Sequence, residues 1–185
     1  MSTPGLPDPA KLVAGVFTAR RDLFEPVARD LMERFGPADL ISPWLDFDFT
    51  TYYAREFGSP LYRRMLCFRD LIGQDDLAGI KRLTNEIELK YSSGRLRQVN
   101  IDPGYLLRER FVLATGKNFA HRIYIGQGIY ADLTLLYYDK AFQKLPWTYP
   151  DYADEKIQTF LYQARSRYVI DLKTAAEADN PQKII

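Results

Sequence analysis

Hydrophobic and polar residues follow two different periods along this chain, and the order of the periods predicts the order of its elements. Four short runs are apolar or alternate between apolar and polar positions, which is typical of β-strands. They cover residues 11–18, 40–49, 61–72 and 96–101. Residues 22–36 and 75–91 instead repeat apolar side chains every three or four positions, which indicates helices with one buried face.

The resulting order, βαββαβ, is that of a ferredoxin-like unit, in which both helices cover one face of an antiparallel sheet. A further helix is predicted over residues 154–172. We therefore expect an α+β fold, a ferredoxin-like βαββαβ antiparallel sheet extended by a C-terminal β-hairpin and a final helix. A length of 185 residues fits a single domain, which we place at residues 11–173, with flexible ends at residues 1–10 and 174–185.

The segment after the predicted sheet contains strong turn signals. Residues 102–104, Asp-Pro-Gly, suit a type II turn. Residues 105–115 have mixed periodicity, and we expect a short helix there. A hairpin follows, with strands at residues 120–125 and 129–138 and a Gly-Gln-Gly loop at 126–128, because glycine supplies the positive φ angles of such loops.

The expected hairpin register divides its residues between two sides. With Ile125 opposite Ile129, one side is apolar except for His121, the only histidine of the chain. The other side places Arg122 opposite Asp132. This pair is either an ordinary cross-strand ion pair or an arginine that holds an anion and is oriented by its aspartate.

Three further features have both a structural and a functional interpretation. His121 is a candidate general base or metal ligand, but without a partner at ligand spacing a satisfied core histidine is the simpler interpretation, and no metal site is predicted. Lys117, after a glycine, either meets a phosphate or carboxylate or is solvated. Trp147 and Tyr149, held extended between prolines, either stack on a ligand or cover one end of the core.

Composition excludes several classes. Lys+Arg 25 against Asp+Glu 24 gives a formal net charge of +1, so non-specific nucleic-acid binding is not expected. The single cysteine, Cys67, excludes an internal disulfide and a multi-cysteine zinc site, and its apolar surroundings predict a buried thiol. The chain has neither a signal-peptide pattern at its start nor a run of about 18 apolar residues, so we expect a soluble cytoplasmic protein without membrane contact.

Several ordered motifs resemble a known family. They are KLVAGVFT, SPLYRR, VNIDPGYL, LATGKNFAHRIYIGQGIYADLTLLY and PWTYPDY, which begin at residues 11, 59, 99, 113 and 146. Together they are similar to a prokaryotic family known as a domain of unknown function, number 4416, over residues 11–168. The resemblance implies a small stand-alone cytoplasmic protein. Because this family has no assigned activity, cofactor or catalytic residue, the resemblance assigns no function to any position.

The leading functional hypothesis is a protein or enzyme that binds a small anionic molecule such as a nucleotide or sugar phosphate. The predicted ligand-binding residues are Asn100, Lys117, Arg122, Asp132, Trp147 and Tyr149, and the candidate proton-transfer residues are His121 and Asp102. The Gly-Gln-Gly loop lacks the context of a dinucleotide site or P-loop, so no cofactor is assigned. A structure without a concave pocket between these side chains would contradict the hypothesis.

Two other hypotheses belong to different classes. One is a protein-interaction or homodimerisation module, which a flat apolar surface over Trp44 and Trp147 would favour. The weaker one is single-stranded RNA binding on the sheet, which the balanced charge disfavours.

Overall fold

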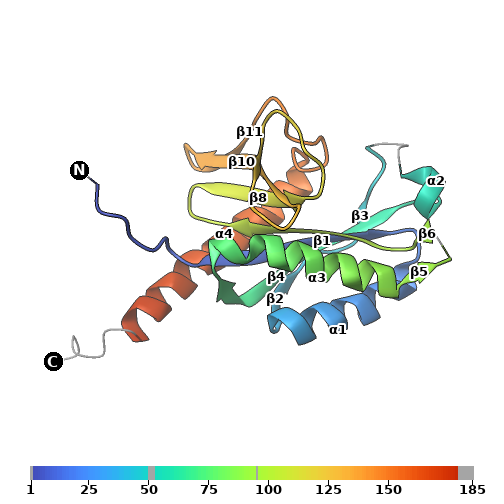
Figure 1. Cartoon of the computed structure of the whole chain (residues 1–185), viewed down its shortest axis with the longest axis horizontal. Helices are drawn as coiled ribbons and strands as arrows, with labels where there is room; N and C mark the ends of the chain where they lie inside the picture. Colours follow the sequence, from blue (N-terminus) through green and yellow to red (C-terminus); the bar gives the residue numbers. More distant parts are fainter. Residues whose placement is uncertain (1, 50–52, 95, 179–185) are drawn as a thin grey trace.

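The computed structural model describes residues 2–49, 53–94 and 96–178 (Figure 1). Its helices are α1 (Phe24–Phe35), α2 (Ala54–Phe57), α3 (Leu77–Lys90) and α4 (Glu155–Ala178), and short 3-10 helices at Arg21–Leu23 and Gln74–Asp76 lead into α1 and α3. The strands are β1 (Ala10–Thr18), β2 (Ala38–Ile41), β3 (Leu45–Asp46), β4 (Tyr62–Ile72), β5 (Ser92–Ser93), β6 (Leu96–Arg97), β7 (Asn100–Leu106), β8 (Arg110–Thr115), β9 (Arg122–Tyr124), β10 (Tyr130–Tyr138) and β11 (Ala141–Lys144).

One large antiparallel sheet organises the described residues. Its main path runs β11-β10-β8-β7-β1-β4-β2, while β3 pairs with β4 and β9 pairs with β10. Every pairing in this sheet is antiparallel. The predicted mixed α+β class with a large antiparallel sheet is therefore confirmed. No helix in the described part of the chain is long and apolar enough to cross a membrane.

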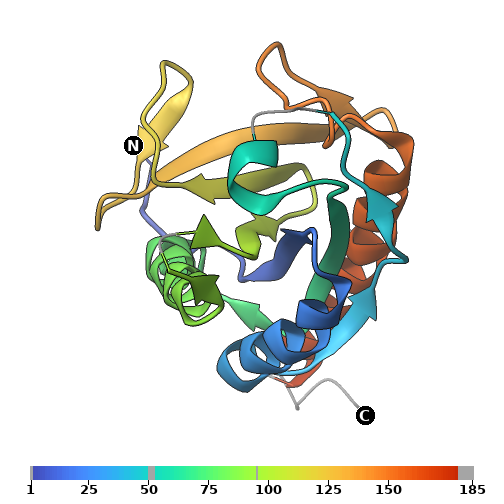
Figure 2. The ribbon, with the colours of Figure 1, turned by 90° about the vertical axis from the view of Figure 1, so that its right-hand side faces the viewer.

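The helices lie on both faces of the sheet. In Figure 2, α1 and α3 lie together at the lower left and α4 lies at the right, with the strands curving between them. Leu12, Ala14 and Val16 of β1 pack toward α1 and α3, where Val27 and Leu31 complete the core. The alternate residues face the other way, and Val13 belongs to the core under α4.

Strands β7 and β8 separate partway along their length. They pair only from Leu106↔Phe111 to Gly104↔Leu113, whereas β7 stays paired with β1 as far as Asn100. The separation begins beside Pro103, which has no N–H to donate to a neighbouring strand. At the last paired position the strands are very close, since a Cβ on Gly104 would lie 2.5 Å from the carbonyl oxygen of Val112. Gly104 therefore marks the point at which β7 and β8 are in contact. Beyond it the two strands separate and leave a wedge-shaped space between them.

Two predictions for this segment are wrong. Residues 102–104 are not a turn but lie inside β7, and residues 105–115 are not a helix but form the end of β7, a short connection and β8. Here Pro103 lies where the pairing of β7 with β8 ends, and Gly104 allows the two strands to approach closely. The mixed periodicity of residues 105–115 reflects burial on both faces, because Phe111, Val112 and Leu113 are all buried.

The predicted hairpin is confirmed, with its register over the three residue pairs of β9. The expected place of His121 on the apolar side is wrong, because His121 lies before β9 and its ring contacts Asp132. Tyr130 pairs with Tyr124 and Asp132 with Arg122. The three loop residues 126–128 all have positive φ, of 96°, 55° and 77°. The strand β11 was not predicted. It follows a tight turn in which Asp139 and Lys140 also have positive φ.

Other differences concern element ends. The strand predicted over residues 40–49 forms two short pieces, β2 and β3, interrupted at residues 42–44, where Pro43 cannot donate a ladder hydrogen bond. Helix α4 continues to Ala178, into the tail that we expected to be flexible from residue 174. Residues 179–185 of that tail lie outside the described residues. Cys67 is fully buried as predicted, and burial raises the pKa of its thiol.

Candidate ligand-binding site

A cavity of about 810 Å³ occupies the wedge between β7 and β8 and the space beside it. Its wall combines strands β4, β7 and β8 with α3 and the segment that precedes α4. Five basic and four acidic side chains line it, namely Arg63, Lys81, Arg97, Lys117 and Arg122 with Glu56, Asp102, Asp132 and Asp151. Aromatic side chains complete the wall: Phe47, Phe49, Tyr53, Tyr149 and Tyr152.

The register of the sheet explains why polar side chains meet here. Phe17 of β1 pairs with Arg63 on one side and with Asn100 on the other, and directly paired residues point to the same face. Asp102 follows two positions after Asn100 and therefore also points to this face. It is the same face that α4 covers farther along the strands. The cavity thus lies over the polar end of a sheet face whose other end is apolar.

Arg63 is the most deeply buried charge of the cavity, with 3% of its side chain exposed. It forms a hydrogen-bonded ion pair with Asp151, and its Nη2 lies 3.6 Å from Asp102 Oδ2. Its guanidinium lies 4.5 Å from the ring centre of Phe47. Burial alone would lower the pKa of Arg63, but the charges of Asp151 and Asp102 raise it above its ordinary value. Arg63 therefore stays charged.

Three side chains that line the cavity each have a buried polar atom without a hydrogen-bond partner among the described residues. These atoms are Nε of Arg63, Nδ2 of Asn100 and the hydroxyl oxygen of Tyr152. Burial raises the pKa of Tyr152 well above its ordinary value, so its hydroxyl keeps its proton. An unsatisfied buried polar group costs on the order of 1–3 kcal/mol. Their position on one cavity indicates that water or a ligand completes them.

Arg122 has a fixed orientation on the other side of the cavity. Its Nε donates to Asp132 Oδ2 at 2.9 Å, one terminal nitrogen donates to the carbonyl of Lys117 at 2.9 Å, and the other donates to the Tyr149 hydroxyl at 2.8 Å. Burial would lower its pKa, but the hydrogen bonds with Asp132 and Tyr149 raise it. The predicted pairing with Asp132 is present, and Asp132 itself is buried.

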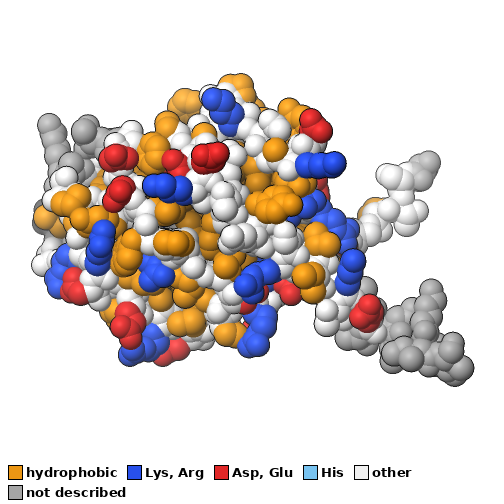
Figure 3. Space-filling view, turned by 180° about the vertical axis from the view of Figure 1, so that it is seen from behind, with side chains coloured by type: hydrophobic (Ala, Val, Ile, Leu, Met, Phe, Trp, Pro, Cys, Tyr) orange, Lys and Arg blue, Asp and Glu red, His pale blue; other side chains and the backbone are white. Residues whose placement is uncertain are grey.

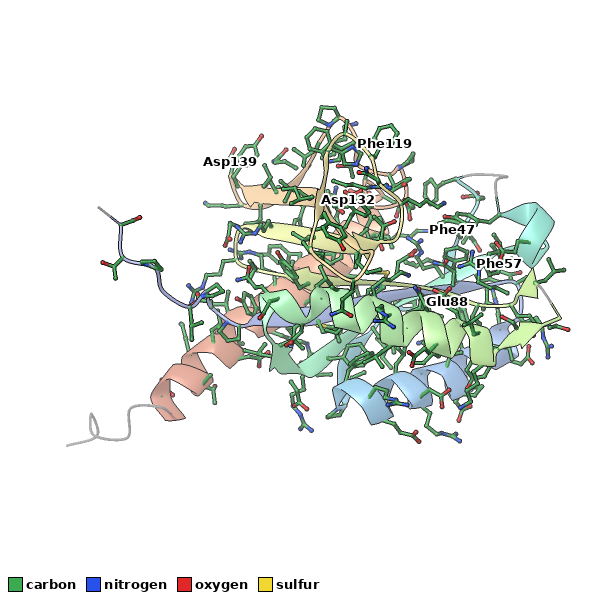
Figure 4. All side chains as sticks on the ribbon, viewed as in Figure 1. Phe47, Phe57, Glu88, Phe119, Asp132 and Asp139 are labelled. Carbon is green, nitrogen blue, oxygen red and sulfur yellow. The ribbon has the colours of Figure 1, made fainter. Side chains whose placement is uncertain are left out.

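A second arginine network closes the end of the cavity near α2. Arg97 donates to both carboxylate oxygens of Glu56, at 2.7 and 3.0 Å, and to Glu88 at 2.8 Å. The Arg97 hydrogen bonds lower the pKa of Glu56. Arg97 also donates to Asn100 Oδ1 at 3.2 Å, which leaves the amide nitrogen of Asn100 as the group without a partner. Figure 4 shows Phe47, Phe57 and Glu88 at this end and Asp132 on the strands above.

His121 and Trp147 do not line the cavity. They stack on one another with ring centres 4.9 Å apart and an interplanar angle of 10°. His121 Nε2 lies 3.2 Å from Asp132 Oδ2, and Trp147 Nε1 donates to the carbonyl of Leu133 at 2.8 Å. Both rings therefore support Asp132 and its strand from outside the cavity.

Six of the eight predicted site residues line the cavity: Asn100, Asp102, Lys117, Arg122, Asp132 and Tyr149. Sequence reasoning missed Arg63, Arg97, Glu56, Asp151 and Tyr152 as members of the same site. One signal was present in the SPLYRR motif, where Arg63 alternates with the apolar Met65 and Cys67 of the following run and so shares their buried face, where a charge needs a partner. The partner itself, Asp151, lies 88 positions away in the chain.

The acidic side chains at the cavity are spread among arginines rather than grouped together. Within the described ranges, no group of three or more histidine, cysteine, aspartate or glutamate side chains could hold a metal ion. The acidic groups of the cavity are instead paired with arginines. Such a wall offers many N–H donors, several carboxylate acceptors and aromatic surface.

Together the fold and this cavity define a mixed α+β protein with one curved antiparallel sheet and a polar cavity between two separating strands. The chain belongs to the family described as a domain of unknown function, DUF4416, whose model matches residues 8–168. This finding confirms the resemblance seen in the sequence motifs. No curated protein and no solved structure matches the chain.

Proposed function

We propose that this protein binds a small anionic ligand of the nucleotide or sugar-phosphate kind in the cavity between β7 and β8. The observation that carries the proposal is the convergence of Arg122, Lys117 and aromatic side chains on one cavity of about 810 Å³. This volume is typical of small-molecule sites, which lie within roughly 300–1,000 Å³.

Arg122 is the proposed anchor for the anion. An arginine has five N–H donors, and three of them reach Asp132, Lys117 and Tyr149. The other two have no acceptor in the part of the chain that the structure describes, which leaves them for a phosphate or carboxylate. Because its protein contacts already hold the guanidinium, a ligand pays little of the entropy of ordering it.

Aromatic side chains at the cavity provide a place for a flat or apolar part of the ligand. Phe49 and Tyr149 are 40% and 48% exposed, so both rings present free surface. A nucleobase or the C–H face of a sugar can pack on such a ring. The sequence suggested that Trp147 stacks on a ligand. We assign this stacking to Phe49 and Tyr149 instead, since Trp147 stacks on His121.

Asp102 rather than His121 is the proposed proton carrier if the ligand reacts. Asp102 lines the cavity, with 29% of its side chain exposed. His121 is separated from the cavity by Asp132, to which it is hydrogen-bonded.

The test is binding by the whole chain of inorganic phosphate, AMP and ribose 5-phosphate, followed as a shift of the melting temperature. A ligand that binds only the folded protein raises its stability by RT ln(1 + [L]/Kd), which is roughly 2.7 kcal/mol at one hundred times Kd. We expect at least one of the three to raise the Tm, and Arg122→Gln to weaken that effect by at least about tenfold. Arg29→Gln, an exposed charge removal on α1, is the control. No shift with any of these probes would contradict the proposal.

One observation favours an interaction module as the second candidate function. Phe119, Ile123 and Tyr124 are 65%, 71% and 58% exposed at and just before β9, which pairs with β10 on one side. A self-associating chain would lose its dimer in sedimentation experiments when Ile123→Asp is introduced. The predicted surface over the two tryptophans is not supported, because Arg21 and Arg64 lie over Trp44.

Single-stranded RNA binding has weaker support. Figure 3 shows acidic and basic side chains interspersed with hydrophobic ones on the face seen from behind, rather than a broad basic area.

We also propose that β7, β1, β4 and β2 with α1 and α3 form a ferredoxin-like unit. Their neighbour order and antiparallel pairing support it. An experimental structure in which β1 does not lie between β7 and β4 would contradict it.

A further inference from the structure

The two sides of the cavity differ in charge balance, and this difference narrows the class of ligand. On the side formed by β8, β9 and α2, three basic side chains, Arg122, Lys117 and Arg97, stand against two carboxylates, Asp132 bonded to Arg122 and Glu56 bonded to Arg97. On the side formed by β4 and β7, Arg63 is matched by two carboxylates, Asp151 and Asp102. A phosphate is attracted to the first side and repelled by the two carboxylates of the second.

The second side is nevertheless rich in groups that form hydrogen bonds. Arg63 Nε and Asn100 Nδ2 are buried donors without partners among the described residues, and the Tyr152 hydroxyl is likewise unpaired. Asp102 and Asp151, which contact the terminal nitrogens of Arg63, line the same cavity and supply carboxylate acceptors. A hydroxyl group donates one hydrogen bond and accepts up to two. Donors and acceptors side by side therefore match neighbouring hydroxyl groups better than they match an anion.

Tyr152 packs against the sheet at Gly15 on this second side of the cavity. A Cβ on Gly15 would lie 3.3 Å from the Tyr152 hydroxyl oxygen, so the absence of a side chain there allows the tyrosine to reach the sheet. Tyr152 lines the cavity and is 2% exposed, and its unpaired hydroxyl is buried against the sheet beside Gly15.

We propose that the ligand is a phosphorylated sugar, with its phosphate at Arg122 and Lys117 and its hydroxyl groups at Arg63, Asn100, Asp102 and Tyr152. This inference rests on the proposed anionic-ligand function and deepens it, because it assigns a separate subsite to the uncharged part. Ribose 5-phosphate and AMP share the required sugar phosphate, and they differ in whether a base is present.

The test measures dissociation constants by calorimetry for the full chain with ribose 5-phosphate, 2-deoxyribose 5-phosphate, AMP, ribose and inorganic phosphate. Ribose 5-phosphate is expected to bind at least about tenfold more tightly than inorganic phosphate, and the 2-deoxy sugar about tenfold more weakly than its parent. A site built to hydrogen-bond a hydroxyl discriminates against the analogue that lacks it. AMP binding that exceeds that of ribose 5-phosphate identifies the nucleotide as the source of the sugar phosphate, and the reverse order identifies the free sugar phosphate.

The variant Asp102→Asn tests whether Asp102 contacts the sugar hydroxyl groups. It is expected to weaken ribose 5-phosphate about tenfold and to leave inorganic phosphate within about twofold, because only the sugar meets Asp102. Asp139→Asn is the matched control: it removes the same charge at the β10–β11 turn, and asparagine tolerates the positive φ of 49° there. Figure 4 labels Asp139 at the opposite end of the upper strands from Phe47. If Asp102→Asn lowers the Tm of the unliganded protein, the hydroxyl subsite is tested instead by comparing ribose 5-phosphate with 2-deoxyribose 5-phosphate on the unchanged chain.

The outcomes separate this inference from the function on which it rests. Equal binding of phosphate, ribose 5-phosphate and the 2-deoxy sugar would overturn the hydroxyl subsite and leave the anion site in place. Ribose that binds as tightly as ribose 5-phosphate would overturn the phosphate assignment. No binding of any phosphorylated probe would refute both proposals.

Discussion

The sheet face that α4 covers has an apolar half and a polar half, and the two halves obey different rules. Under α4, Val13, Phe111 and Leu113 pack with Leu161 of the helix. On β4 and β7, which neighbour β1 in the sheet, Arg63, Asn100 and Asp102 point to the same side but line the cavity. An apolar side chain is stabilised by any close-packed neighbour, whereas a buried charge needs particular partners in a particular geometry. One sheet face thus combines a core that accepts many apolar side chains with a site whose charged side chains need specific partners.

The covering elements differ in the same way. Helix α4 buries Ile157, Phe160, Leu161 and Ala164 over the apolar half. The segment just before it places Asp151 and Tyr152 over the polar half. One continuous stretch of chain thus changes from charge pairing to apolar packing at the start of α4.

The largest expected effect is the loss of Arg63. Arg63→Met leaves Asp151 buried without its partner, and breaking a buried pair in this way costs about 3–5 kcal/mol. Urea denaturation measures the loss. In the double variant Arg63→Met/Asp151→Asn the loss should be clearly smaller than the sum of the two single losses, since the two residues contact each other. Additive losses would mean that the pair does not stabilise the polar half.

A core truncation in the apolar half should have a comparable or slightly smaller effect on stability but none on the site. Leu161 is fully buried under α4, and Leu161→Ala is expected to cost about 2–5 kcal/mol. The dissociation constant of the ligand, measured by calorimetry well below the melting temperature of the variant, should stay as in the unchanged chain. The exposed neighbour in the same helix provides the control Gln163→Ala, which should change stability by less than about 0.5 kcal/mol. A lost ligand response in Leu161→Ala alone would show that the halves are coupled.

The two halves also differ in how well the sequence predicts them. The short apolar run of β1 and the three- and four-residue spacing of α1 and α3 identified the elements, because local patterns encode burial. The Arg122–Asp132 pair was predictable because both residues belong to one hairpin with a defined loop. The Arg63–Asp151 pair was not, because its partners are 88 residues apart and meet only through the tertiary fold. The turn predicted at Pro103-Gly104 was wrong for a related reason. These residues lie in a strand because β1 and β8 pair with them, and both pairings depend on the tertiary fold.

The ion pair at the edge of the polar half predicts a pH dependence. Hydrogen bonds from Arg97 lower the pKa of Glu56, so this carboxylate stabilises the fold above its unfolded pKa of about 4.3 and loses that contribution as the pH falls through the lower folded value. Glu56→Gln should cost about 1 kcal/mol at pH 7 and should lessen the stability lost between pH 5 and pH 3. Urea midpoints at pH 7, 5 and 3 measure both changes. The exposed Glu25→Gln serves as control, and an acid response as steep in Glu56→Gln as in the unchanged chain would contradict the assignment.

The smallest expected effect is a gain, on the helix that covers the opposite face. Gly79 lies inside α3, and a Cβ built there meets nothing within 4 Å. Gly79→Ala should raise the free energy of unfolding by up to about 1 kcal/mol, because alanine restricts the unfolded chain and favours the helix. Gly104→Ala, at the apex of the wedge, is its counterpart: a Cβ there lies 2.5 Å from a backbone oxygen, so a loss of about 1–3 kcal/mol is expected. Thermal and urea unfolding of both variants measure the contrast, and a gain at Gly104 would contradict the close approach of β7 and β8 that defines where the cavity begins.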